Sequence, residues 1–81
     1  MRPAGPVEDR QTRARTRLDL LSDREREVVL AVGRGLSNAQ IGAELYLSVA
    51  TVKAHVSRLL VKLDVANRVQ IALLTHDADL V

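Results

Sequence analysis

From Leu18 onward, apolar residues recur at three- and four-residue intervals, which is the spacing of amphipathic helices. The stripes predicted to be buried are Val28, Val29 and Val32; Ile41 and Leu45; and Val49, Val52, Val56, Leu59, Leu60 and Leu63. The last segment, residues 68–76, is apolar on nearly every side, and so small a body cannot bury all of it within one chain. The pattern therefore predicts an all-α fold of four helices with spare apolar surface on the fourth.

Polar residues mark the points where these helices begin and end. The predicted N-caps are Ser22, Ser37, Ser48 and Asn67, of which the first two form capping boxes with Glu25 and Gln40. Gly33 and Gly35 are expected to end the first helix. The second helix is short, residues 38–45, and the third runs over residues 49–63. Asp64 is expected to leave the third helix with a positive φ, which aspartate tolerates better than most residues.

Residues 1–17 differ in character from the rest of the chain. They hold both prolines, five arginines and two acidic residues, with almost nothing apolar. This composition predicts a flexible linker or tail, followed by one folded domain over residues 18–81.

Composition excludes several kinds of chemistry. The chain has no Cys, so disulfides, thiolate metal sites and cysteine nucleophiles are absent. It has no Phe or Trp and a single Tyr, which rules out reading nucleic acid by aromatic stacking. The two histidines, far apart in the sequence, make no metal site, and no acid, base and nucleophile converge. We therefore expect neither an enzyme nor a cofactor, and no apolar run is long enough to span a membrane.

Charge is distributed unevenly along the chain, although the formal net charge is only +2. Residues 48–68 carry four basic residues against one acidic residue, as phosphate contact would need. A short helix, a three-residue connection and a longer helix make a helix-turn-helix candidate, whose second helix enters the major groove. The exposed face of that helix would be slim, with Ala50, Ala54 and Ser57 beside Lys53. An ordinary helical bundle with a small, basic face is the alternative interpretation.

Several linked motifs resemble the LuxR-type helix-turn-helix domain of the NarL/FixJ response regulators. They are Leu21-Ser22-Asp23-Arg24-Glu25-Arg26-Glu27-Val28, Gly35-Leu36-Ser37-Asn38, Ile41-Gly42-Ala43-Glu44-Leu45, Leu47-Ser48, Thr51-Val52-Lys53-Ala54-His55-Val56, Lys62-Leu63 and Asn67-Arg68. The resemblance covers residues 18–81 in unbroken register. It implies sequence-specific binding of double-stranded DNA in the cytoplasm, as the effector domain of a two-component transcriptional regulator.

The resemblance also implies a set of contact residues. Lys53, Ala54 and Ser57 correspond to base-facing positions, while the phosphate or supporting positions are Ser37, Asn38, Ser48, Thr51, His55 and Arg58. His55 is equally compatible with a histidine packed against protein. The family dimerises through its last helix, which implicates Val69, Ala72 and Leu73, with His76 at the edge. The implied partners are duplex DNA, a second copy in a DNA-dependent dimer, and RNA polymerase.

Some positions carry separate expectations. Asn67 and Arg68 are expected to be structural, as a cap and an ion-pair donor. Lys62 either contacts a phosphate or faces solvent, and we expect solvent. Gly42 replaces a common Ala, which costs helix propensity of roughly 1 kcal/mol and changes no chemistry. Ser57 stands where several relatives carry Lys, so one contact differs.

The organisation of the whole protein stays open at this point. The chain is either an excised effector domain with its linker or a stand-alone single-domain regulator. A helical protein-interaction module, whose fourth helix grips a partner, is the rival function.

Overall fold

The computed structural model describes residues 6–81, with side chains from Asp9 onward, and every element in that range is a helix. In chain order these are α1 (Pro6–Asp19), α2 (Asp23–Gly33), α3 (Asn38–Leu45), α4 (Val49–Lys62) and α5 (Arg68–Asp77). The all-α class is thus confirmed, but the structure adds α1 to the four helices that the sequence predicts.

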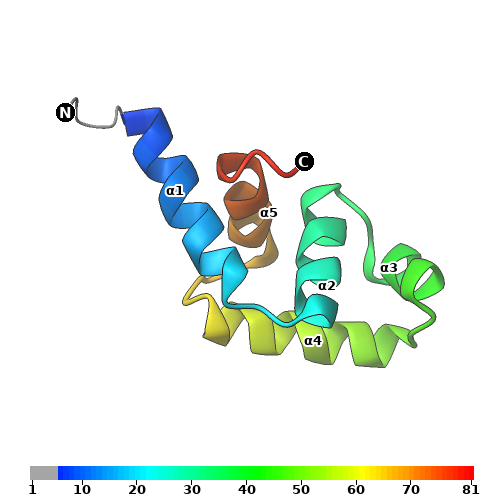
Figure 1. Cartoon of the computed structure of the whole chain (residues 1–81). Coiled ribbons are helices and arrows are strands. Elements are labelled where there is room, and N and C mark those ends of the chain that lie inside the picture. The colour runs from blue at the N-terminus through cyan, green and yellow to red at the C-terminus, as the bar shows by residue number, and fades with distance from the viewer. Residues whose placement is uncertain (1–5) are drawn as a thin grey trace.

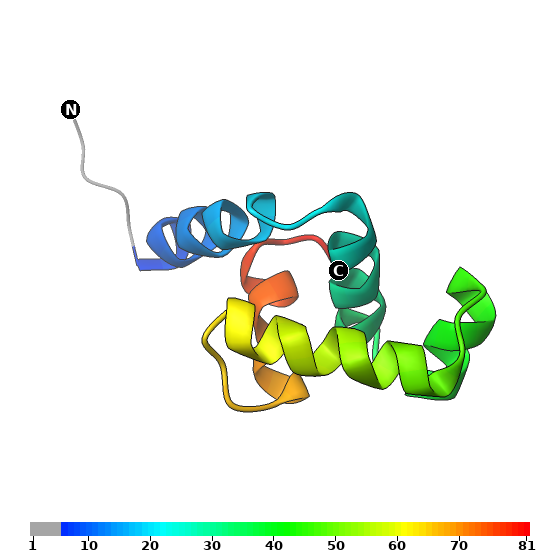
Figure 2. The same ribbon diagram turned by 90° about the horizontal axis from the view of Figure 1, so that it is seen from below.

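Helix α4 forms the base on which the other elements are arranged (Figure 1). α2 and α5 lie side by side and both contact α4, while α3 packs on α4 near its first residues. Seen from below, α3 stands at one end of α4 and α5 lies near the other (Figure 2). One long side of α4 therefore faces away from the body and remains free for a partner.

The core between the helices is aliphatic. Its buried members are Ala14, Leu18, Val28, Val29, Ala31, Val32, Ile41, Val52, Val56, Leu59, Leu63, Ile71 and Ala78. The predicted stripes supply most of this set, with Leu45 and Leu60 half-buried at its edge. Val49 was predicted to be buried, and this was wrong: it is the first residue of α4 and is 44% exposed.

Capping fixes the helix starts as predicted. Ser22 and Ser37 both complete capping boxes, with the side chains of Glu25 and Gln40 accepting from the N-cap backbone. Ser48 and Asn67 each accept from the backbone N–H three residues later. Satisfying these N–H groups removes the main reason for the helix ends to fray.

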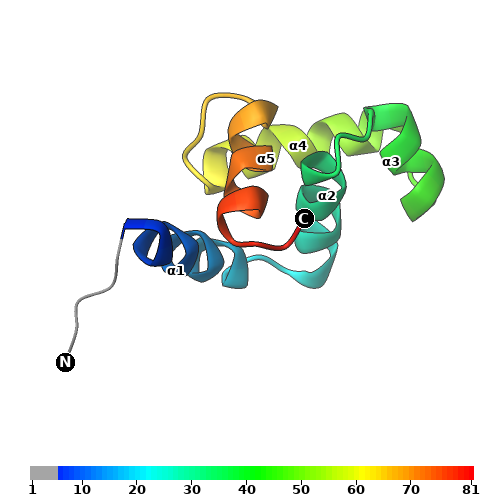
Figure 3. The same cartoon turned by 90° about the horizontal axis from the view of Figure 1, so that it is seen from above.

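The α1 helix corrects the prediction of a flexible tail over residues 1–17. Of that range, residues 1–5 lie outside the described part, and the rest is helical. Ala14 and Leu18, one helical turn apart, are buried against α5, and the Arg15 Nε donates to the Ala78 carbonyl over 2.8 Å. Two apolar residues are too few to show a period in the sequence, so only the tertiary contact reveals the helix. Its first turns extend away from the body (Figures 1 and 3).

Helices α2 and α5 approach closely at Gly33. A β-carbon on Gly33 would overlap the Thr75 side chain, whose hydroxyl donates to the Ala72 carbonyl over 2.6 Å. Thr75 is fully buried, so it has no open side into which to move. Glycine at position 33 therefore sets how closely these two helices pack.

Candidate nucleic-acid interface

The connection between α3 and α4 is a tight, hydrogen-bonded turn. The Gly42 carbonyl accepts from the backbone N–H of Tyr46 and, over 2.8 Å, from that of Leu47. Tyr46 takes a left-handed conformation with φ of 59°, and its side chain is 94% exposed. These bonds fix the angle between α3 and α4, which is what a helix-turn-helix needs in order to present α4 to DNA.

Gly42 does more in this turn than the sequence suggests. A β-carbon at Gly42 would overlap the Leu47 backbone carbonyl, an atom that cannot rotate away as a side chain can. The expectation that Gly42 brings only a loss of helix propensity is therefore incomplete. In this chain the glycine lets the turn approach α3 directly.

The free side of α4 carries the predicted base-facing residues together. Lys53, Ala54 and Ser57 are exposed, with Ala50 and Arg58 exposed alongside them, whereas His55 is half-buried. The first half of this face has only small side chains around Lys53, so its backbone can approach a groove closely. At the far end of the same face Val61 is 82% exposed, an apolar position for which the sequence analysis assigned no role.

Ser48 and Thr51, two of the predicted phosphate-contact residues, hydrogen-bond to each other at the start of α4. Ser48 Oγ accepts from the Thr51 backbone N–H over 3.1 Å and lies 2.9 Å from the Thr51 hydroxyl oxygen. Both side chains are exposed. The first turn of α4 therefore presents two hydroxyls and free backbone N–H groups in a fixed arrangement, the kind of donor set that binds a phosphate.

Asn38 and Arg68 form a second ordered contact, at the start of α3. The Arg68 guanidinium donates to Asn38 Oδ1 over 2.7 Å and to the Leu36 carbonyl over 2.9 Å. Arg68 was predicted to be an ion-pair donor, and this was wrong: among the side chains that the structure describes, its partners are neutral oxygens. The sequence could not show this link, because the residues are about thirty positions apart.

The predicted dimerisation residues share the outer side of α5. Val69 is 63% exposed and Leu73 54% exposed, His76 is exposed, and Ala72 is half-buried. The opposite side of α5 carries the fully buried Ile71 and Thr75. The spare apolar surface predicted for the last helix is therefore present, concentrated at Val69 and Leu73.

Lys62 is exposed, as expected, and its side chain also contacts α2. Its Nζ donates to Glu25 Oε1 over 2.8 Å, and the same oxygen accepts from the Ser22 backbone N–H over 2.9 Å. The hydrogen bond from Lys62, followed by that from Ser22, lowers the pKa of the Glu25 carboxyl to about 2 from its usual 4.5. Lys62 is thereby withdrawn from the residues available for DNA.

The Lys62→Met variant is expected to be less stable than the wild type by about 0.5–1 kcal/mol at neutral pH, because the pair is partly exposed. The lowered pKa of Glu25 means that its stabilisation is complete above pH 4.5 and is lost as the pH falls towards 2. Urea unfolding at several pH values should show the difference between the two proteins shrinking across that window. A difference independent of pH would contradict this assignment.

The comparison with known families decides what this arrangement is. Residues 19–75, more than half of the chain, match the family described as bacterial regulatory proteins, luxR family. The chain belongs to the luxR family. Its helix-turn-helix is that of a DNA-binding transcriptional regulator.

Curated relatives whose names describe transcriptional or response regulators agree with this assignment. The chain is 41% identical over 61 residues to the transcriptional regulatory protein LiaR of Bacillus subtilis (strain 168), covering 75% of this chain and 29% of LiaR. It is 52% identical over 52 residues to the nitrate/nitrite response regulator protein homolog of Haemophilus influenzae (strain ATCC 51907 / DSM 11121 / KW20 / Rd), covering 64% of this chain and 25% of the relative. The match thus spans under a third of each relative's length.

The family match begins at residue 19, so all of α1 except its last residue lies outside the matched range. Within residues 6–81, no helix has both the length and the apolar character required to span a membrane.

Proposed function

We propose that this luxR-family chain reads double-stranded DNA as the effector part of a two-component response regulator, with α4 in the major groove. One observation carries the proposal: Lys53, Ala54 and Ser57 stand together on a free face of α4, with only small side chains around Lys53. In this arrangement Lys53 reaches guanine acceptors and Ala54 contacts a thymine methyl group. Ser57 faces the bases beside them, and Arg58 and His55 follow towards the phosphates.

Phosphate contacts supply most of the affinity in this proposal and flank the groove on both sides. Ser48 and Thr51 bind one phosphate at the start of α4, and Ser37 and Asn38 bind another at the start of α3. The ordered hydroxyls of Ser48 and Thr51 support the first of these contacts.

The first experiment is selection from a pool of random duplexes at moderate salt. Recovery of a short motif supports the proposal and supplies an operator. Retention without any sequence preference would contradict specific recognition by α4. No retention at low salt, from protein shown to be folded, would favour the protein-interaction module instead.

The Lys53→Ala variant is expected to bind the recovered duplex about 1–3 kcal/mol more weakly than the wild type. The reason is that Lys53 is the one Lys or Arg on the first half of the free face of α4, where the surrounding side chains are small. Fluorescence anisotropy titration measures the change. Lys62→Ala is the matched control on the same helix, because Lys62 already pairs with Glu25. Equal affinities for Lys53→Ala and the wild type would remove Lys53 from the interface.

Two copies of the chain bind DNA together in this proposal, through Val69, Ala72 and Leu73 on α5, with His76 at the rim. The exposure of Val69 and Leu73 supports such a contact. The same exposure is what favours the rival interaction module, so a second copy and a foreign partner must be separated by experiment. Two half-sites about one helical turn apart follow from a dimer.

The Leu73→Glu variant is expected to lose cooperative binding to a two-site duplex. In the proposed dimer, the new carboxylate would be buried against the α5 helix of the second copy, which is also negatively charged at this position. The variant should remain folded, since Leu73 is already 54% exposed. Binding to one-site and two-site duplexes, compared by gel shift, measures the loss. Leu20→Glu, at a leucine that is 75% exposed before α2, is the matched control. Cooperativity that survives Leu73→Glu and Val69→Glu would place the dimer contact elsewhere.

The remaining parts of the proposal concern the whole protein. It acts in the cytoplasm, where its DNA lies, with RNA polymerase as a further partner. It catalyses no reaction and needs no cofactor of its own. Residues 18–81 form the DNA-binding unit, and α1 leads into it.

A further inference from the structure

Arg68 is the first residue of α5, yet its side chain reaches the start of α3. We propose that Arg68 is a positioning residue for DNA binding, which acts by orienting the side-chain amide of Asn38 towards a phosphate. The inference rests on the DNA contact proposed above for the start of α3. It goes beyond that contact by assigning a role to a residue on α5, outside the helix-turn-helix.

The first step is the direction of the hydrogen bond. A guanidinium can only donate, so Asn38 must turn its Oδ1 towards Arg68 and not its amide nitrogen. The bond from Arg68 to this oxygen is 2.7 Å long, and the second arm of the guanidinium is held by the Leu36 carbonyl at 2.9 Å. These two hydrogen bonds fix the position of the guanidinium, and the bond to Oδ1 fixes the orientation of the Asn38 amide.

The second step is what the orientation leaves free. The Asn38 Nδ2 group has no hydrogen-bond partner among the described residues, and the side chain is only half-buried. The capping box occupies the Ser37 and Gln40 backbone N–H groups, which leaves those of Asn38 and Ala39 without a helical acceptor. The free groups of Asn38 and Ala39 are thus all donors, which suits the acceptor-only oxygens of a phosphate.

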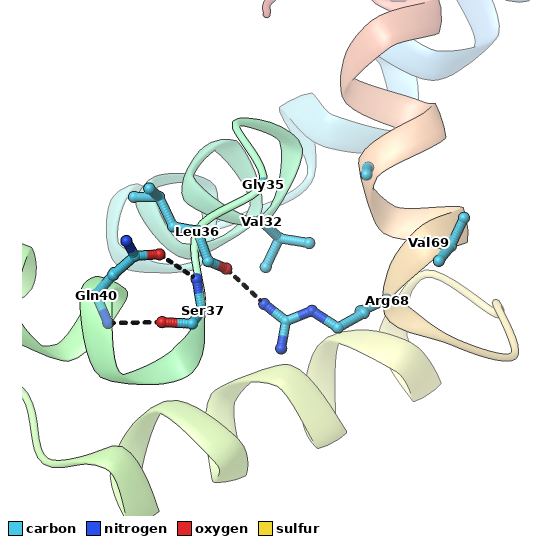
Figure 4. Close-up of a pocket in the computed structure, with 8 residues that line it drawn as sticks. Val32, Gly35, Leu36, Ser37, Gln40, Arg68 and Val69 are labelled. Atoms are coloured by element: carbon cyan, nitrogen blue, oxygen red, sulfur yellow. Dashed lines mark hydrogen bonds between the residues drawn. The ribbon is translucent and has the colours of Figure 1, made fainter.

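The third step is the position of Arg68 itself. It lines a groove between α5 and the connection from α2 to α3, with Leu36 and Ser37 on one side and Val69 on the other (Figure 4). The guanidinium is partly buried there, and the ion pairs found among the described side chains all join other residues. Its charge adds positive potential at the start of α3, but a lysine could supply that charge equally well. What only arginine supplies is the forked contact with Asn38 and Leu36.

The test is a double-mutant cycle on DNA affinity, with the duplex recovered from the random pool as the probe. Arg68→Lys keeps the charge and breaks the fork, and Asn38→Ala removes the amide. Each is expected to weaken binding about three- to tenfold, as the loss of one hydrogen bond does. The double variant should bind about as weakly as either single variant, because both changes remove the same contact. Circular dichroism at the assay temperature confirms that every variant is folded.

Other outcomes overturn the proposal. Wild-type affinity in Arg68→Lys would mean that charge alone matters, and additive losses in the double variant would mean that the two residues act separately. Asn38→Asp provides a readout that is independent of folding, because it keeps an acceptor for Arg68 while removing the donors. This variant should fold like the wild type and bind DNA more than about tenfold more weakly; wild-type affinity in it would also overturn the proposal.

Lys53→Ala, measured in parallel, separates this inference from the proposed function. If the wild type does not bind duplex DNA, or if Lys53→Ala binds as well as the wild type, the proposed reading of DNA by α4 fails. If Lys53→Ala weakens binding while the cycle is additive, only the role of Arg68 is overturned.

Discussion

The Leu18→Ala variant is expected to unfold with a free energy about 2–5 kcal/mol below that of the wild type. Leu18 is 1% exposed at the last turn of α1 and belongs to the same buried cluster as Ile71 and Ala78. Truncation removes its contacts and leaves a cavity, because Leu18 is fully buried within the core. Urea unfolding followed by far-ultraviolet circular dichroism measures the loss.

Leu20 is the matched control for this prediction. It has the same side chain two residues later but is 75% exposed, so Leu20→Ala should change the free energy of unfolding by less than about 0.5 kcal/mol. Equal, small effects at both positions would mean that α1 does not pack on the domain in solution. The contrast therefore tests whether α1 is an integral helix or the tail that its composition suggests.

Gly33→Ala is expected to lower the free energy of unfolding by about 1–3 kcal/mol. In an open helix this substitution is favourable by about 1 kcal/mol, so even the sign is informative. The loss arises because the new methyl group overlaps the buried Thr75 side chain and forces α2 and α5 apart. Thermal or urea unfolding measures the effect.

Thr75→Ala in the Gly33→Ala background provides the second half of this test. It removes Oγ1 and Cγ2, two of the three Thr75 atoms that a methyl group at position 33 would meet, and leaves only Cβ. The double variant should be more stable than the sum of the two single losses predicts, with a coupling of about 0.5–3 kcal/mol. Strictly additive losses would show that the clash is relieved by movement elsewhere.

The parts of this fold that could be predicted from sequence are those governed by neighbours in the chain. Ser37 with Gln40, for example, specifies the start of α3 because both hydrogen bonds of the capping box join residues three positions apart. The positive φ of Asp64, now found to be 54°, follows from a helix exit at a residue that tolerates it. The family match confirms the luxR-type domain that the linked motifs indicate.

The parts that could not be predicted depend on contacts between distant positions. The ion pair of Lys62 was missed because Glu25, its partner, lies 37 residues away. α1 was missed because Ala14 and Leu18 gain their burial only when α5 is in place. For the predicted DNA-contact residues of α4, sequence and structure agree on which side chains share its free face. The binding experiments above test which of them touch bases.

The exposed Tyr46 has a practical consequence for spectroscopy. It is the only aromatic residue in the chain, and it stands in the turn between α3 and α4 with 94% of its surface in water. Intrinsic fluorescence therefore reports on this turn and not on the core, and unfolding should change the emission little because the ring is already solvated. A duplex that docks against the turn should quench the emission, so the chain carries its own optical reporter for DNA at the place where the two helices of the motif meet.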